Sequence, residues 1–114
     1  MLREHLRGWL EEAGASESEV FDVMLASGEV FTNAREHPKE PTSDLVEFYG
    51  TISKQALVTI SIRDYGTWLN GNVLNAGGLG LVIVETVMDS FRVDTAETGT
   101  VVTMQRQLRT DLAA

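Results

Sequence analysis

The chain contains no cysteine and only two prolines among its 114 residues. The absence of cysteine excludes a disulfide framework, a zinc–thiolate site and a cysteine nucleophile. No apolar run approaches the roughly 20 residues that a membrane-spanning helix requires, and the longest, 79–88, contains Gly80, Glu85 and Thr86. The N-terminal residues show neither the apolar core nor the cleavage site of a signal peptide. We therefore expect a soluble cytoplasmic protein without a membrane partner.

Basic side chains are also scarce, because 9 lysines and arginines stand against 17 acidic residues, which gives a net charge of -8. A nucleic-acid-binding surface needs clustered lysine and arginine, so we expect no nucleic-acid partner. A nucleotide site remains open, since backbone N–H groups and a metal ion can bind phosphates. The apolar fraction of 43% suffices for one core, so residues 1–114 are expected to form one domain.

Hydrophobic periodicity predicts two consecutive helices at the start of the chain. Apolar residues recur with helical spacing from Leu2 to Ala13, and Gly14 is a plausible end for this helix. Ser16 and Glu19 resemble a capping box, so a second helix should follow and run to His37, before Pro38. We expect the inward face of this second helix to consist of Val20, Phe21, Met24, Leu25, Gly28, Phe31 and Thr32.

Alternating apolar and polar residues predict a β-hairpin over 45–63, with a turn at 53–55. Asp64 continues the apolar side of the second strand, so its carboxylate should point toward the helix-covered face of the sheet. A polar linker is expected over 39–44 and a loop over 66–80.

The last third of the chain predicts a helix, a turn and two strands. Residues 79–90 are apolar nearly all round, which is typical of a buried helix. A short strand over 91–93, a turn over 97–99 and a final strand over 101–108 should follow. Helices on one face of a mostly antiparallel sheet are the economical packing for this order of elements.

Three polar residues of the second helix stand four positions apart: Glu29, Asn33 and His37. Four helical steps advance by about 400°, so these side chains form one stripe along the helix, on the face that also bears Asp22 and Ala26. The ordinary interpretation is a solvated face. Asn33, however, has poor helix propensity, and its carbonyl oxygen can ligate Mg²⁺. Glu29, one turn away, can accept a proton from an attacking hydroxyl group.

Three further motifs have both an ordinary and a functional interpretation. Asp64-Tyr65-Gly66 is a common turn sequence, but an inward carboxylate at a strand end can also accept a hydrogen bond from a ligand amine. Residues 77–80 form either a flexible connector or a phosphate cradle at a helix N-terminus. Gly99-Thr100 is usually a turn, although the threonine hydroxyl could also contact Asp64 or a ligand.

The order of these motifs along the chain resembles that of the GHKL, or histidine-kinase-like, ATPase superfamily. The resemblance is closest to the bacterial anti-sigma-factor serine/threonine kinases. Two segments carry it, because Val30-Phe31-Thr32-Asn33-Ala34 and the stretch 80–89 are similar in sequence to the corresponding motifs of that family. It extends from about residue 2 to about residue 108. It implies an α+β fold, a two-layer α/β sandwich with helices on one face of a mixed, mostly antiparallel sheet.

The resemblance implies a site for ATP and Mg²⁺ on the second helix. Glu29 would be the general base that activates an acceptor serine hydroxyl group, and it would be the catalytic residue. Asn33 would bind the nucleotide through Mg²⁺, for which it would be the protein ligand. His37 would lie near the phosphates.

The remaining nucleotide contacts implied by the resemblance come from the second half of the chain. Asp64 would bind the adenine amino group, Gly66 would shape the adenine pocket, and Thr100 would support Asp64. Gly78 and Gly80 would contact the phosphates. A lid over the nucleotide would be formed by 70–76.

The family also implies partners, namely a sigma factor that the protein sequesters and a small STAS-type antagonist protein that it phosphorylates. Kinases of this family often form homodimers. Two departures from the family pattern, Trp68 in place of a glycine and Leu79 in place of a frequent arginine, leave open a nucleotide-binding or degenerate interaction module without kinase activity. A third alternative is an ATP hydrolase or a histidine-kinase catalytic domain. The usual first strand is not evident before Leu2, which leaves open that this single domain is part of a longer regulator.

Overall fold

The computed structural model describes residues 2–36, 38–39, 46–65, 67–68, 79–96 and 99–109. Its helices are α1 (Leu2–Glu12), α2 (Glu17–Glu36) and α3 (Leu79–Val87). Its strands are β1 (Pro38–Lys39), β2 (Val46–Ile52), β3 (Leu57–Asp64), β4 (Thr67–Trp68), β5 (Ser90–Ala96) and β6 (Gly99–Gln107).

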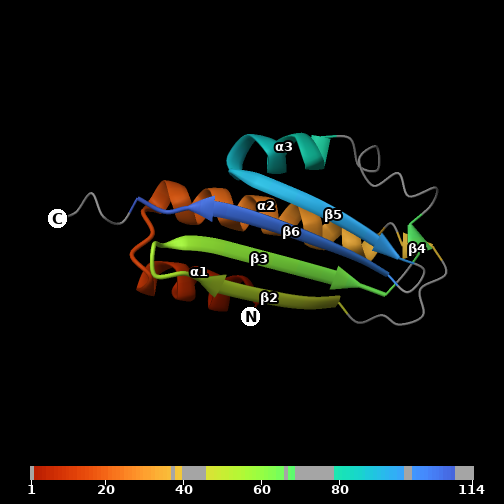
Figure 1. Ribbon diagram of the computed structural model, residues 1–114, viewed down its shortest axis with the longest axis horizontal. Helices are drawn as coiled ribbons and strands as arrows, with labels where there is room; N and C mark the ends of the chain where they lie inside the picture. The colour runs from red at the N-terminus through yellow and green to blue at the C-terminus, as the bar shows by residue number, and fades with distance from the viewer. Residues whose placement is uncertain are drawn as a thin grey trace.

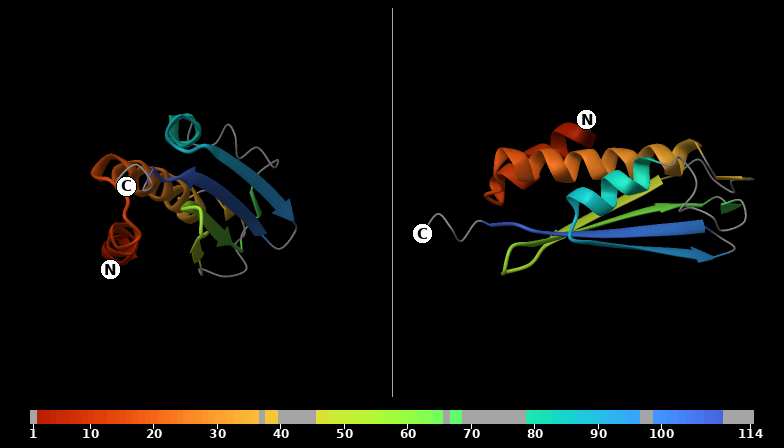
Figure 2. Two further views of the ribbon diagram at one scale, coloured as in Figure 1. Left: turned by 60° about the vertical axis from the view of Figure 1, so that its left-hand side comes forward. Right: turned by 90° about the horizontal axis from the view of Figure 1, so that it is seen from above.

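Four of the strands form one antiparallel sheet in the order β2-β3-β6-β5, and all three helices lie on one face of it (Figures 1 and 2). This confirms the predicted α+β fold with two layers. Strands β1 and β4 form a separate antiparallel pair, so the predicted linker over 39–44 and the loop over 66–80 each contribute residues to a strand. Within the described residues no helix combines the length and apolarity needed to cross a bilayer.

The first two helices begin and end where local chemistry predicts. Gly14, just after α1, has a φ of 91°, a conformation that glycine adopts at little cost. At the start of α2, the N–H of Glu19 donates to Ser16 Oγ (3.2 Å) and the N–H of Ser16 donates to Glu19 Oε1 (2.9 Å). The capping box is therefore confirmed, and it satisfies two backbone donors at the helix N-terminus.

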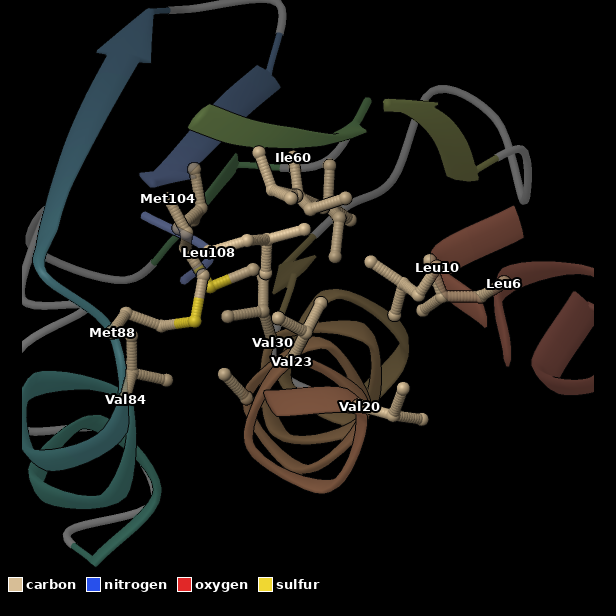
Figure 3. Packing of buried hydrophobic residues seen from close by; sticks show 14 residues of the cluster. Leu6, Leu10, Val20, Val23, Val30, Ile60, Val84, Met88, Met104 and Leu108 are labelled. Atoms are coloured by element: carbon tan, nitrogen blue, oxygen red, sulfur yellow. The ribbon is translucent and has the colours of Figure 1, made fainter. Parts of the chain in front are cut away.

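The core lies between α2 and the inner face of the sheet (Figure 3). Val58, Ile60 and Ile62 contribute the alternate, inward positions of β3. The other buried apolar residues come from every helix and from the C-terminal part of the chain: Leu6, Leu10, Val20, Val23, Ala26, Val30, Val84, Met88, Val102, Met104 and Leu108.

The predicted inward face of α2 is wrong in part. Phe21 is 62% exposed, and Gly28 and Thr32 are also exposed. The positions that face the sheet are instead Val23, Ala26, Ser27 and Val30, which follow the i, i+3, i+4, i+7 pattern from a different starting residue. The two apolar faces of α2 compete in the sequence, and contact with β3 and β6 selects the one with smaller side chains.

The polar stripe predicted on α2 is not a uniformly solvated face. Ala26, within it, is fully buried, and Glu29 is half-buried. Asp22 accepts a hydrogen bond from Arg106 Nη1 of β6 at 2.7 Å. The same nitrogen donates to the carbonyl oxygen of Val87 at the end of α3 (2.5 Å). Arg106 therefore joins α2, α3 and the sheet.

Helix α3 differs from the prediction in length and burial. It ends at Val87, and Ser90 already belongs to β5. Val84 and Met88 face the core, whereas Val82 is 56% exposed, so α3 packs through one side only. Its apolar composition had indicated burial all round.

The two last strands are longer than predicted. Strand β5 extends from Ser90 to Ala96, where the sequence predicted 91–93. Strand β6 begins at Gly99, which the sequence had assigned to a turn, and ends at Gln107. Continuous antiparallel pairing between these strands outweighs the weak strand propensity of their ends.

Glu19 joins the start of α2 to the chain that follows β6. Its Oε2 accepts a hydrogen bond from the N–H of Arg109 at 2.8 Å, in addition to the capping-box bond from Ser16. Burial raises the pKa of this carboxyl group, but the hydrogen bonds from Ser16 and Arg109, with the nearby charge of Arg106, outweigh burial and leave the pKa below its usual value.

We expect Glu19→Gln to lower the free energy of unfolding by about 1–3 kcal/mol at neutral pH, because charge-assisted hydrogen bonds are lost. Since the pKa of Glu19 is lower in the folded than in the unfolded state, the unfolded state binds more protons, and this stabilisation disappears as the pH falls through the folded pKa. Urea unfolding should show the wild type and variant converging in acid. The control Glu17→Gln, exposed in the same turn, should have a smaller effect, and a constant difference at all pH values would contradict the assignment.

Candidate functional site

Asp64 is the last residue of β3, and its side chain lies on the helix-covered face of the sheet. The residue is only 3% exposed. This confirms the orientation that the period-2 pattern predicts for its carboxylate. A buried carboxylate at the end of a strand requires hydrogen-bonding partners, and such an acceptor can also recognise an amino group of a ligand.

Thr100 lies directly opposite Asp64 in the pairing of β3 with β6. It is also buried, with 2% exposure. The predicted proximity of these two residues, one from the hairpin and one from the last strand, is therefore present. They form a small polar region at one end of the mainly apolar interior.

Gly99 brings the two strands together at this point. Its φ is 155°, and a Cβ atom at this position would lie 2.1 Å from the carbonyl oxygen of Asp64. Only glycine permits this approach of the two backbones. The register that places Thr100 beside Asp64 therefore depends on the residue that precedes Thr100.

Side-chain contacts on the outer face of the sheet hold the residue that immediately follows Asp64. Tyr65 Oη donates a hydrogen bond to Glu47 Oε1 at 2.5 Å, and the guanidinium carbon of Arg63 lies 4.8 Å from the centre of the Tyr65 ring. The hydrogen bond to the Glu47 carboxylate raises the pKa of the Tyr65 phenol above its usual value. This cluster fixes the backbone that enters the predicted Asp64-Tyr65-Gly66 motif, and the sequence had not indicated it.

The pairing of β1 with β4 brings the end of α2 to the end of β3. Pro38 follows α2 after one residue and pairs with Trp68, and Thr67 follows Asp64 after two residues. Figure 1 shows the ends of α2, β3 and β5 near β4 at the same end of the molecule. The second half of α2 and the Asp64–Thr100 pair therefore lie at the same end of the molecule.

Glu29 and Asn33 both belong to this half of α2, one turn apart. Glu29 is half-buried, while for Asn33 only the helical backbone is described. Gly80 is the second residue of α3. His37, Gly66, Gly78 and the predicted lid over 70–76 lie outside the described residues.

These residues have the chemistry that a nucleotide with Mg²⁺ requires. A buried carboxylate suits the amino group of a base, and a helix N-terminus such as that of α3 suits phosphate. Asn33 offers an amide oxygen, a donor that Mg²⁺ accepts together with substrate phosphates and water. Asn33 is the residue that would hold the ion.

Comparison with known proteins shows the family. A sequence profile of the histidine kinase-like ATPase domain matches residues 1–106, so the chain belongs to this family. Membership confirms the resemblance to the GHKL superfamily and implies nucleotide binding as the class of function. It does not by itself define an acceptor or a partner.

Solved structures show the same fold. The structure of the RsbU and RsbW domains of Rv1364c from Mycobacterium tuberculosis matches 94% of this chain with 28% identity and a TM-score of 0.76. The histidine kinase domain of the blue-light activated histidine kinase EL346 from Erythrobacter litoralis matches 80% of this chain with 22% identity and a TM-score of 0.67. The chain spans 28% of the first protein and 45% of the second.

We expect Gly99→Ala to destabilise the protein by more than about 1 kcal/mol, because the new Cβ conflicts with both the backbone conformation and Asp64. Urea unfolding measures the change. The control Gly8→Ala, in α1, places a Cβ in open space and should be neutral or stabilising by up to about 1 kcal/mol. Equal stability of the two variants would mean that the β3–β6 approach is not as close as described.

Proposed function

We propose that this chain is the ATP-binding domain of an anti-sigma-factor serine/threonine kinase. It binds ATP with Mg²⁺ at the end of the molecule where α2, β3 and β6 meet. It phosphorylates a serine of a small STAS-type antagonist protein and sequesters a sigma factor. The single observation that carries the nucleotide assignment is the buried pair of Asp64 and Thr100 at this end of the sheet.

In this proposal each described residue has a separate task. Asp64 accepts a hydrogen bond from the adenine amino group, and Thr100 holds Asp64 in place. Glu29 accepts the proton of the serine hydroxyl group while the γ-phosphoryl group passes from ATP to the serine oxygen and ADP leaves. Phosphoryl transfer depends chiefly on positioning and on charge stabilisation, and Mg²⁺ supplies the positive charge when bound.

The comparisons support the kinase part of this proposal at different levels. Family membership supports ATP binding. Two observations support the anti-sigma-factor type over a complete histidine kinase. One is the similarity to a structure that contains an RsbW domain, and the other is the sequence of residues 30–34 and 80–89. The choice of serine, antagonist and sigma factor rests on this resemblance.

Asp64→Asn is expected to weaken Mg·ATP binding at least about tenfold, because the amide has one acceptor oxygen instead of two and lacks the negative charge that strengthens a hydrogen bond from the adenine amino group. Isothermal titration calorimetry measures the dissociation constant. The control Asp94→Asn alters an exposed carboxylate of β5 that pairs with Arg92, and should bind ATP as the wild type does. Wild-type affinity in Asp64→Asn, with the fold intact by circular dichroism, would contradict the adenine assignment.

Glu29→Ala should retain ATP binding within about twofold and lose about 10²–10⁴-fold in the rate of transfer, since only the general base is removed. Transfer of labelled phosphate to a cognate antagonist provides the rate. Glu12→Ala, which removes an exposed carboxylate of α1, is the matched control. Unchanged transfer by Glu29→Ala would remove Glu29 from the mechanism.

Trp68 and Leu79 replace a glycine and a frequent arginine of the family. These replacements favour one alternative, in which the chain is a degenerate interaction module without kinase activity. Titration with Mg·ATP separates the two, because the degenerate module would show no affinity at millimolar nucleotide. ATP turnover without any protein acceptor would instead indicate a hydrolase.

A further inference from the structure

An open apolar groove lies between α1, α2 and strand β2. It has a volume of about 670 Å³, within the range of small-molecule binding pockets. The apolar residues that line it are those that the sequence had placed in the core, together with residues of α1 and β2: Leu6, Phe21, Met24, Leu25, Phe31 and Phe48. Phe21, 62% exposed, is the largest of the exposed apolar side chains in this part of α2.

The α1 side of the groove is positively charged. Arg3 and Arg7 both line it, one helical turn apart on the same face of α1. Both are exposed, and Arg7 Nη1 lies 4.0 Å from Glu11 Oε2. In a chain with a net charge of -8, this local pair favours an occupant with acidic side chains.

The groove also reaches the proposed general base. Glu29 lines the groove, and Gly28 beside it is exposed. A Cβ atom on Gly28 would meet nothing within 4 Å, so no intramolecular contact requires a glycine in this helix. Because Gly28 has no side chain, another backbone can pass close to the helix at this point and approach Glu29.

We propose that this groove binds the acceptor segment of the substrate protein, a stretch in which the phosphorylated serine is accompanied by a large apolar residue and an acidic residue. The inference rests on the proposed kinase function. The serine lies over Gly28 beside Glu29, the apolar side chain packs against Phe21 and Met24, and the acidic side chain faces Arg3 and Arg7. Specificity for the substrate is then a property of α1 and α2.

The dimensions of α2 define the spacing within the segment. Phe21 and Glu29 are eight residues apart, about 12 Å along the helix axis. An extended chain spans this distance with about four residues. The apolar residue of the acceptor should therefore stand about four positions from the serine.

Methionine methyl groups provide a direct test, since the chain has four methionines. Met24 lines the groove, while Met88 and Met104 are buried in the core. The probe is a synthetic serine peptide with a leucine four positions away and flanking aspartates, added to methyl-¹³C-methionine protein that holds Mg²⁺ and an ATP analogue. We expect a shift of the Met24 signal with little change at Met88 and Met104.

A matched peptide with lysines in place of the aspartates should bind at least about tenfold more weakly. Arg3→Glu should abolish or reverse this preference, and Lys54→Glu, in the exposed hairpin turn, should leave it unchanged. A Met24 signal that ignores the peptide, or responds equally to both peptides, would overturn the inference. So would a Met24 shift that follows protein concentration alone, because a second copy would then occupy the groove.

Gly28→Ala tests the approach to Glu29 without damaging the fold, because alanine favours a helix and the added methyl group meets no neighbour. With ATP, the KM for the acidic peptide should rise about tenfold while the KM for ATP stays unchanged. Gly8→Ala, in the interior of α1, should alter neither KM. Unchanged peptide KM in Gly28→Ala, or a bound peptide whose serine is never phosphorylated, would contradict the acceptor assignment.

The two proposals fail in distinguishable ways. ATP affinity without a peptide-dependent Met24 shift would overturn the groove assignment alone. A Met24 shift in a protein without ATP affinity would overturn the kinase assignment and, with it, the role of the groove as an acceptor site.

Discussion

The pairing of β3 with β6 is the constraint on which the candidate site depends. Its register places Val58, Ile60 and Ile62 in the core and brings Asp64 opposite Thr100. A slip of one residue would turn this whole set toward solvent and bury Arg63 instead. The apolar core therefore holds the polar pair in position, and Gly99 permits the backbone approach at the end of the ladder.

The opposite end of the molecule holds the helices in place. Glu19 accepts hydrogen bonds from Ser16 and from Arg109, which joins the start of α2 to the chain after β6. Arg106 donates hydrogen bonds to Asp22 of α2 and to the carbonyl oxygen of Val87 at the end of α3. Since Gly80 lies in the first turn of α3, the direction in which α3 presents its N-terminus is determined partly by these contacts at its far end.

Sequence patterns correctly predicted the structural features that depend only on residues close together in the chain. The capping box at Ser16 and the inward orientation of Asp64 follow from spacing alone, and both are present. The face of α2 could not be predicted in this way, because Phe21 and Val23 begin two overlapping apolar patterns. Only the strands that pack against α2 select one of them, and the rejected pattern forms the groove.

Contacts between distant segments could not be predicted from the sequence either. The close approach of Gly99 to Asp64 joins residues 35 positions apart, and the pairing of Pro38 with Trp68 joins residues 30 positions apart. Weak signals for them existed in the glycine before Thr100 and in the proline after α2. Neither signal identifies its partner without the fold.

The most direct measurement is a crystal structure of the chain with Mg²⁺ and a non-hydrolysable ATP analogue. We expect the adenine amino group to lie within hydrogen-bonding distance of the Asp64 carboxylate, and Asn33 Oδ1 to lie in the coordination sphere of the ion. A nucleotide bound elsewhere, or an Asp64 carboxylate that contacts only protein while the nucleotide is bound, would contradict it.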